Sequence, residues 1–171
     1  MSICLSTYAV ADVSVGYGIG YDNLHVNAAI GDSTSATSTT PFHLFYMSRY
    51  ARDARWYAEY SKSDFHFKGD VTNIGQNVSY TSLNAGWQTQ FAVSRDFKPW
   101  LGLGLGGQSA KLSNRHTTFS NGFLNQTFPD EEVSTLQWFV DASHDFVLSE
   151  QTFLNTRIQY VSPTSNGVGY Y

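Results

Sequence analysis

Apolar and polar residues alternate with a period of two along most of this chain. From Val13 onward, Val, Tyr and Ile alternate with Ser, Gly and Asp, and the same alternation returns in later segments. Because successive side chains of a β-strand point to opposite faces, this pattern predicts strands with one apolar and one polar face. The expected strands are residues 13–22, 42–49, 55–61, 80–93, 100–108, 136–143 and 154–160, with only VGYY left for an eighth.

The connections between these strands alternate between long and short. Residues 31–41 (GDSTSATSTTP) read as a polar loop, residues 51–55 (ARDAR) as a tight turn, and residues 114–133 as another long loop. The strands are roughly 9–11 residues long, the length that a tilted strand needs to cross a bilayer. The pattern therefore predicts one domain of consecutive antiparallel hairpins.

Composition indicates which face points inward. Aromatic residues make up 16% of the 171 residues and charged residues only 14%, whereas soluble domains carry about 25% charged residues. Amides, hydroxyls and a few Arg, Asp and Glu residues dominate the polar faces, and Lys, which is common on soluble surfaces, is scarce. This favours a hydrogen-bonded interior and an apolar exterior that meets lipid. The net charge of −4 argues against a nucleic-acid partner.

Four stretches carry a resemblance to a known family: VSVGYGIGY, RWYAEY, SLNAGWQTQF and KPWLGLGLGG. Together with the alternating loop lengths, they resemble the small outer-membrane β-barrel proteins of the OmpA/OmpX type, over residues 12–171. The resemblance implies an all-β fold, an eight-stranded antiparallel up-and-down transmembrane barrel. It also implies short periplasmic turns, longer extracellular loops, a place in the cell outer membrane of a Gram-negative bacterium, and a monomer. The short eighth strand departs from the family pattern.

The first residues suggest a leader sequence. Ala9-Val10-Ala11 fits the small-residue pattern of a signal-peptidase site, although no Lys or Arg precedes Arg49. We expect residues 1–11 to be a signal-peptide remnant and residues 12–171 to be the barrel. The alternative is an ordinary N-terminal extension of a strand.

The polar faces supply the candidate interior residues. Glycines lie at alternate positions of the first and fifth expected strands, which face each other across an eight-stranded barrel: Gly16, Gly18, Gly20, Gly102, Gly104 and Gly106. They leave room either for inward side chains such as Phe139, Phe153 and Met47 or for a small ligand cavity or passage. A polar network in the lumen is expected from Arg55, Glu59, Asp141 and Arg157, paired as Glu59 with Arg157 or Asp141 with Arg55.

Three further groups are candidates for contacts outside the barrel. Cations near the long loops are expected either to meet lipopolysaccharide phosphates or to be solvated: Lys62, Lys68, Lys111 and Arg115. Apolar loop residues are expected either to contact a host or surface protein or to pack on the rim: Phe119, Phe123, Leu124 and Phe128. Aromatic residues near strand ends are candidates for interfacial girdles: Tyr21, Tyr50, Trp56, Tyr80, Phe91, Trp100 and Tyr160.

The sequence offers little for catalysis. Its five histidines form no closely spaced pair, so a metal site is not expected, and neither is a cofactor. His116 lies near Asp130, Glu131 and Glu132, but no serine completes a hydrolase-like arrangement. We expect a non-enzymatic surface role in adhesion or in host or envelope interaction. The alternatives are a narrow channel or carrier for small hydrophobic molecules, and a soluble ligand-binding β-barrel.

Overall fold

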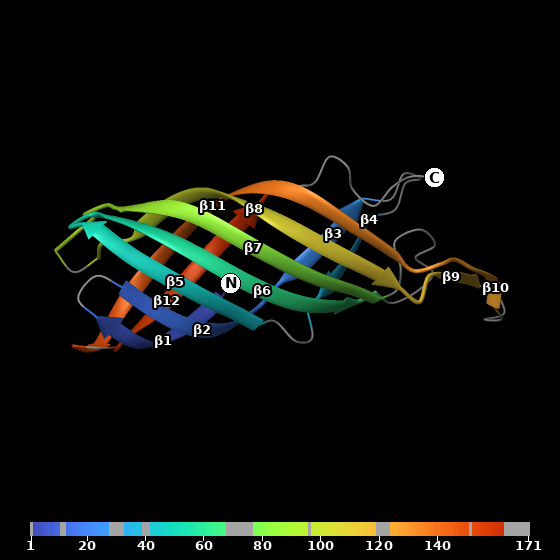
Figure 1. The fold of residues 1–171 in the computed structure, drawn as a ribbon, viewed down its shortest axis with the longest axis horizontal. Helices are drawn as coiled ribbons and strands as arrows, with labels where there is room; N and C mark the ends of the chain where they lie inside the picture. Colours follow the sequence, from blue (N-terminus) through green and yellow to red (C-terminus); the bar gives the residue numbers. More distant parts are fainter. Residues whose placement is uncertain are drawn as a thin grey trace.

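The computed structural model is all-β, and its main strands form one antiparallel, strongly curled sheet (Figure 1). The structure describes residues 2–10, 13–27, 33–38, 42–67, 77–95, 97–118, 124–150 and 152–162. The strands of the sheet, in spatial order, are β1 (Ser2–Val10), β12 (Thr152–Val161), β11 (Glu131–Ser149), β8 (Trp100–Ser113), β7 (Asn77–Gln90), β6 (Ala54–His66), β5 (Phe42–Ala51) and β2 (Val13–Gly20). No helix in these described ranges has the length and apolar character to cross a membrane.

Strand β1 is paired on both of its edges. Residues 2–5 pair with residues 154–157 of β12, and β1 also pairs with β2 along residues 13–20. Sequence reasoning gave the eighth strand to VGYY, which lies outside the described residues. The signal peptide over residues 1–11 stays a prediction, and in this structure residues 2–10 belong to the sheet.

The seven segments with clear alternation are all strands, and several run further than predicted. Strand β11 has 19 residues, and β7 and β8 have 14 each. These extensions enter segments expected to be loops, since β11 already begins at Glu131. Two short hairpins also lie in expected loops: β3 (Asn23–Asn27) with β4 (Ser33–Thr37), and β9 (His116–Thr118) with β10 (Leu124–Thr127).

The polar stretch of residues 31–41 is thus not wholly a loop. Residues 23–27 (NLHVN) of β3 do alternate between polar and apolar residues, a signal that sequence reasoning missed, whereas residues 33–37 (STSAT) of β4 carry none, because Ser and Thr accept extended geometry without apolar alternation. Ala36 of this hairpin is buried in a cluster with Phe65, Val78 and Leu112, and Leu24 packs against it. A further bridge joins Ser38 to Phe65. The hairpin therefore covers inward-facing apolar residues at the ends of β6, β7 and β8.

Long and short connections lie at opposite ends of the sheet. Residues 52–53, 91–99 and 150–151 connect strands at one end, and residues 21–41, 67–76 and 114–130 connect them at the other; the connection 91–99, with nine residues, is nearly as long as 67–76, with ten. Because consecutive strands are antiparallel, successive connections lie at alternate ends of the sheet. In Figure 1, β9 and β10 extend beyond the rest of the sheet at the end with the long connections.

Candidate functional site

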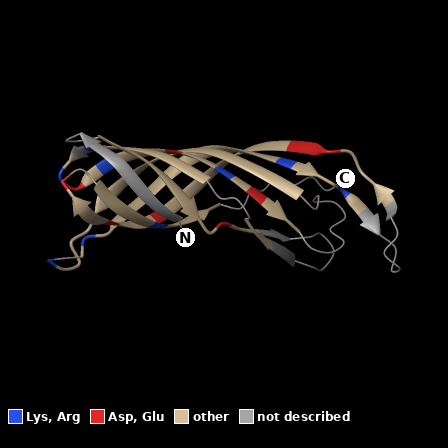
Figure 2. Cartoon of the chain, turned by 90° about the horizontal axis from the view of Figure 1, so that it is seen from below, with Lys and Arg blue, Asp and Glu red and all other residues tan. Residues whose placement is uncertain are grey.

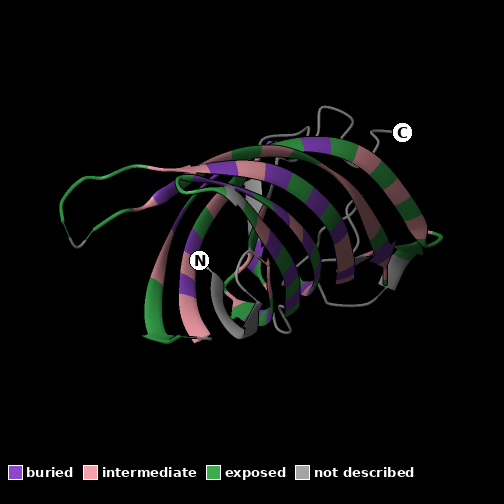
Figure 3. Cartoon of the chain, turned by 60° about the vertical axis from the view of Figure 1, so that its left-hand side comes forward, coloured by how far each residue is buried: buried purple, intermediate pink, exposed green. Residues whose placement is uncertain are grey.

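Buried and exposed residues alternate along the strands (Figure 3). The buried residues are largely polar and the exposed ones largely apolar, which is the reverse of the pattern in a soluble protein. Leu103, Leu105 and Leu136 have exposed fractions of 60%, 71% and 89%. In contrast, Glu59 and Arg157 are 1% and 3% exposed. The exposed apolar residues form what we call the outer belt: Val15, Tyr17, Ile19, Leu44, Tyr46, Trp56, Leu83, Leu101, Leu103, Leu105, Leu136, Trp138, Val140, Ile158 and Tyr160.

One part of the buried polar network joins four strands or their ends. An ion pair links the Arg157 guanidinium to Glu59, and Nδ1 of His43 lies 2.8 Å from the same carboxylate oxygen of Glu59. Nε2 of His43 lies 3.5 Å from Asp22, which also accepts a hydrogen bond from Ser63. Paired and hydrogen-bonded charges of this kind are the form in which ions are tolerated away from water.

Asp22 lies at the end of β2, where this chain of contacts reaches the end with the long connections. Burial opposes ionisation of the Asp22 carboxyl, but the close contact with the charged His43 ring and the hydrogen bond from Ser63 outweigh burial. The pKa of Asp22 is therefore held below its usual range. The carboxylate is the form that these neighbours stabilise.

A second part of the network is centred on Arg55. Its Nη1 lies 2.6 Å from Oδ2 of Asp145, and its Nε donates to Oε1 of Gln88 at 2.6 Å. Asp141 instead accepts hydrogen bonds from the hydroxyl of Tyr57 at 2.5 Å and from Nε2 of Gln88 at 2.7 Å. Of the two pairs considered from sequence, Glu59–Arg157 is present, whereas Arg55 takes Asp145 as its ion-pair partner in place of Asp141.

Sequence reasoning missed His43, Tyr57, Gln88 and Asp145 as members of this network. All four lie on the inward face of their strands. The alternation of β11 already marks Asp145, because it follows Asp141 and Ser143 at two-residue steps. Which carboxylate meets Arg55 depends on how β6 and β11 face each other across the interior, and that relation is not local in sequence.

The glycines of β8 make room for neighbouring side chains. A Cβ at Gly104 would lie 2.2 Å from Cζ of Phe139 and 2.3 Å from the carbonyl oxygen of Ala85. A Cβ at Gly106 would lie 1.9 Å from Oδ1 of Asn84, and one at Gly102 would lie 2.6 Å from Oδ1 of Asp141. The space beside these glycines is therefore occupied, as in the first of the two readings considered from sequence.

The glycines of β2 lie on the opposite wall. Gly16 and Gly18 are buried and Gly20 is half-buried. In the strand order, β2 lies four positions from β8, after β7, β6 and β5. Gly86 of β7, which sequence reasoning did not single out, is the register partner of Gly104, and a Cβ there would lie 2.9 Å from Cζ of Phe139.

Aromatic residues complete the filling of the interior. Phe45, Met47, Tyr57 and Phe139 form a buried cluster, in which the rings of Tyr57 and Phe139 are 5.7 Å apart. The centre of the Arg157 guanidinium lies 5.3 Å from the Tyr57 ring, so the cluster and the ionic network are in contact.

Two of the residues predicted for the aromatic girdles are inside the sheet. Trp100 is 0% exposed, with the guanidinium carbons of Arg55 and Arg49 at 4.0 and 5.2 Å from its ring. Tyr80 donates a hydrogen bond to Oε1 of Gln137 at 3.0 Å. Both predictions are wrong because proximity to a strand end does not decide the face on which a residue lies. Tyr21, Trp56, Phe91 and Tyr160 are exposed as expected, and the side chain of Tyr50 lies outside the description.

The predicted outer contacts are only partly described. Lys62 and Lys111 are exposed, and Figure 2 shows charged segments near both ends of the sheet. Arg115 is half-buried, with Nη1 2.8 Å from Oε2 of Glu131 and its guanidinium carbon 5.9 Å from the ring centre of Phe128. These contacts connect the base of β9–β10 to the start of β11. Residues outside the description are Lys68, Phe119, Phe123 and the side chain of Leu124.

The chain shows no similarity from which a family can be assigned. No protein-family profile matches it, and no curated protein or solved structure resembles it at a significant level. Within the described residues, no three His, Cys, Asp or Glu side chains are grouped closely enough to hold a metal ion. The features of the molecule that bear on function are therefore the inverted polarity, the filled interior and the long connections at one end.

Proposed function

We propose that this protein is an integral outer-membrane β-barrel of eight strands, closed through β1, with a non-enzymatic surface role. The observation that carries the proposal is the inverted polarity. Burial of Glu59 and Arg157 together with exposure of Leu103, Leu105 and Leu136 matches a barrel in lipid, where apolar residues face outward and polar residues fill the lumen. In water, an apolar belt of this extent would be an unusually large exposed patch.

Hydrogen bonding supports the same proposal. A strand edge left unpaired in hydrocarbon exposes backbone groups at a cost of several kcal/mol each. In this sheet β1 has partners on both edges, β12 and β2, so each main strand has two neighbours. The alternative of a soluble ligand-binding barrel requires inward-facing leucines, and Leu101, Leu103 and Leu105 face outward.

The filled interior favours a surface role over a channel or carrier. Phe139 occupies the space beside Gly86 and Gly104, and the Glu59–Arg157 pair lies across the same interior. A passage for a small hydrophobic molecule would require these groups to move together. We therefore expect the purified protein to show no steady conductance in a planar bilayer.

The long connections are the parts we propose for adhesion or for host or envelope interaction. They lie at one end, where β11 extends to Glu131 and where Arg115 contacts both Glu131 and Phe128. These contacts of Arg115 hold the hairpin β9–β10 where it extends beyond the sheet (Figure 1). In the proposed orientation, this end is extracellular and the short connections are periplasmic.

Membrane fractionation with a heat-shift gel tests the barrel. We expect the protein in the outer-membrane fraction, recovered only with detergent, and moving faster on a gel before boiling than after boiling. Recovery in the aqueous fraction without a mobility shift would overturn the membrane assignment.

Replacement of residues 117–127 by a short Gly-Ser linker tests the surface role. We expect the heat shift to persist while binding to host cells or envelope components is lost. The matched control replaces residues 93–96, in the connection at the opposite end, and should leave binding unchanged. Undiminished binding by the 117–127 variant would remove the role from this hairpin.

A further inference from the structure

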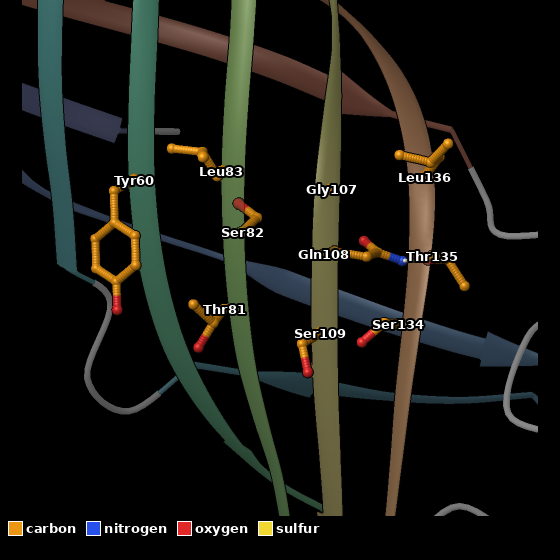
Figure 4. Close-up of a pocket in the computed structure, with 10 residues that line it drawn as sticks. All are labelled: Tyr60, Thr81, Ser82, Leu83, Gly107, Gln108, Ser109, Ser134, Thr135 and Leu136. Atoms are coloured by element: carbon orange, nitrogen blue, oxygen red, sulfur yellow. Dashed lines mark hydrogen bonds between the residues drawn. The ribbon is translucent and has the colours of Figure 1, made fainter.

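A shallow groove of about 510 Å³ crosses the outer face of β6, β7, β8 and β11 (Figure 4). Gly107 lies at its centre, and a Cβ at that position would meet nothing within 4 Å. This distinguishes Gly107 from Gly104 and Gly106, where a Cβ would collide with inward-facing groups. The groove is therefore a gap in the outer belt rather than a product of interior packing.

Strand register arranges the outward-facing residues around this gap in rows. Gly107 pairs with Leu83 on β7 and with Leu136 on β11, whose exposed fractions are 64% and 89%. Tyr60 of β6 pairs with Leu83 and extends the same row. Two prominent leucines thus stand on either side of a bare stretch of backbone, which gives the groove apolar walls.

The next row toward the long connections carries hydroxyl groups. Thr81, Ser109 and Ser134 are register partners on three adjacent strands, and Lys62 pairs with Thr81. Neighbouring strands are about 4.8 Å apart, so the three hydroxyl-bearing residues span roughly 10 Å. All three line the groove (Figure 4).

One row further on, the outward-facing residues are charged or polar. Asp64, Ser79, Lys111 and Glu132 are partners in register, and Ser109 donates a hydrogen bond to Oε1 of Glu132 at 2.8 Å. Cations and carboxylates are balanced here, so this row does not form a purely anion-binding patch. Polarity therefore changes from apolar to hydroxyl to mixed charge within three rows.

We propose that this groove binds one phosphorylated glycolipid of the surrounding leaflet, with an acyl chain over Gly107 and its sugar against the hydroxyl row. A sugar presents several hydroxyls over a width close to that of the row, and Glu132 and Asp64 accept hydrogen bonds from such groups. Lys62, at one end of the row, supplies a cation for a phosphate. The inference rests on the proposed function, because it requires the outer belt to face lipid.

The order of the rows supports a lipid rather than a soluble sugar. The apolar walls at Leu83 and Leu136 adjoin the belt, and the hydroxyl row lies on the side of the long connections. A lipid in the leaflet at that end has its chain and headgroup in this same order. An acyl chain over Gly107 also fills a gap where the belt would otherwise contact lipid poorly.

The test uses the full chain in detergent, with purified rough lipopolysaccharide as the probe and native mass spectrometry to count bound lipid. Gly107→Leu fills the groove, and Ala142→Leu is the matched control. Ala142 is an exposed position of β11 whose register partners are Leu101 and Ile158, away from the groove. We expect wild type and Ala142→Leu to bind one glycolipid alike and Gly107→Leu to bind roughly tenfold more weakly, a change equivalent to about 1.4 kcal/mol.

A second variant, Ser109→Ala with Ser134→Ala, tests the sugar contact without filling the groove. This double variant should also bind the glycolipid more weakly than wild type. It keeps the proposal testable if Gly107→Leu fails to fold. Phosphatidylglycerol should not displace the glycolipid; equal competition would overturn the sugar assignment. If Gly107→Leu and the double variant both keep the heat shift and bind like wild type, the groove assignment fails while the membrane assignment stands. Absence of a heat shift in wild type would reject the membrane assignment itself.

Discussion

Phe139 of β11 occupies the space that a side chain at position 104 of β8 would fill: a Cβ on Gly104 would lie 2.2 Å from Cζ of the phenyl ring. The two residues are also direct register partners. The inward-facing glycine and the inward-facing phenyl ring therefore pack as one unit. Position 104 of WLGLGLGG must lack a side chain because the Phe139 ring of the neighbouring strand occupies that space.

This relationship predicts that Gly104→Ala destabilises the protein. The added methyl group collides with Phe139 and with the carbonyl of Ala85, and overpacking of this kind costs about 1–3 kcal/mol. Gly107→Ala is the control, because its methyl group meets nothing, and should change stability by less than about 0.5 kcal/mol. Urea unfolding in lipid vesicles measures both. Equal midpoints for the two variants would contradict the packing described here.

The Glu59–Arg157 pair predicts strong coupling between the two residues. Removing one member leaves a buried charge without its partner, which costs about 3–5 kcal/mol. Arg157→Met and Glu59→Gln should each destabilise the protein, whereas the double variant should lose less than the sum of the two. A double-mutant cycle on the unfolding free energy measures this coupling. Strict additivity would show that the interaction between Glu59 and Arg157 does not contribute to stability.

The outer belt predicts a depth-dependent penalty for charge. Leu103→Arg should cost about 2–4 kcal/mol in a bilayer, as expected near the midplane. Leu136→Arg should cost about 0–1 kcal/mol, because Leu136 borders the hydroxyl row where the belt ends. Unfolding in vesicles of uniform thickness measures both substitutions. A larger penalty at Leu136 than at Leu103 would place the belt at a different height on the sheet.

Asp22 predicts a loss of stability in acid. Its pKa in the folded protein lies below the usual value of 3.8, because the His43 ring 3.5 Å away and the hydrogen bond from Ser63 outweigh burial. The stabilisation is therefore complete above that value and disappears as the pH falls through the folded pKa. Asp22→Asn should be less stable than wild type near pH 6, and this gap should narrow toward pH 3. Urea midpoints across that range measure the gap, and a constant gap would exclude the carboxylate as its source.

The sequence was sufficient to predict seven of the eight strands of the main sheet, all except β1, because their signal is local. Period-two alternation marks both faces of β7, β8 and β12 without knowledge of any neighbour. The inward position of Glu59, Asp141 and Arg157 follows from the same pattern. In the hairpin β3–β4, only β3 alternates, over five residues; β4 has no such signal, because its polar residues pair through the backbone and Ala36 alone of them joins the buried apolar cluster.

The partners inside the sheet depend on relations that span most of the chain. Arg55 and Asp145 are 90 residues apart, and Arg55 meets this carboxylate rather than Asp141 because of the curvature and register of several intervening strands. Trp100 illustrates the same limit: a tryptophan at a strand end is typical of a lipid interface, yet this one lies between two arginines inside.

The double pairing of β1 has a consequence for processing and oligomeric state. Strands β2 and β12 are both antiparallel to β1, so they run in the same direction and cannot join each other as an antiparallel pair. Removal of residues 1–11 would therefore expose two edges at once, and each edge is a template for another strand. A processed chain can satisfy these edges in three ways: a parallel ladder between β2 and β12, a strand from its own residues after Ser162, or a strand from a second copy. The mass of the processed protein in detergent therefore shows whether a second copy supplies the strand.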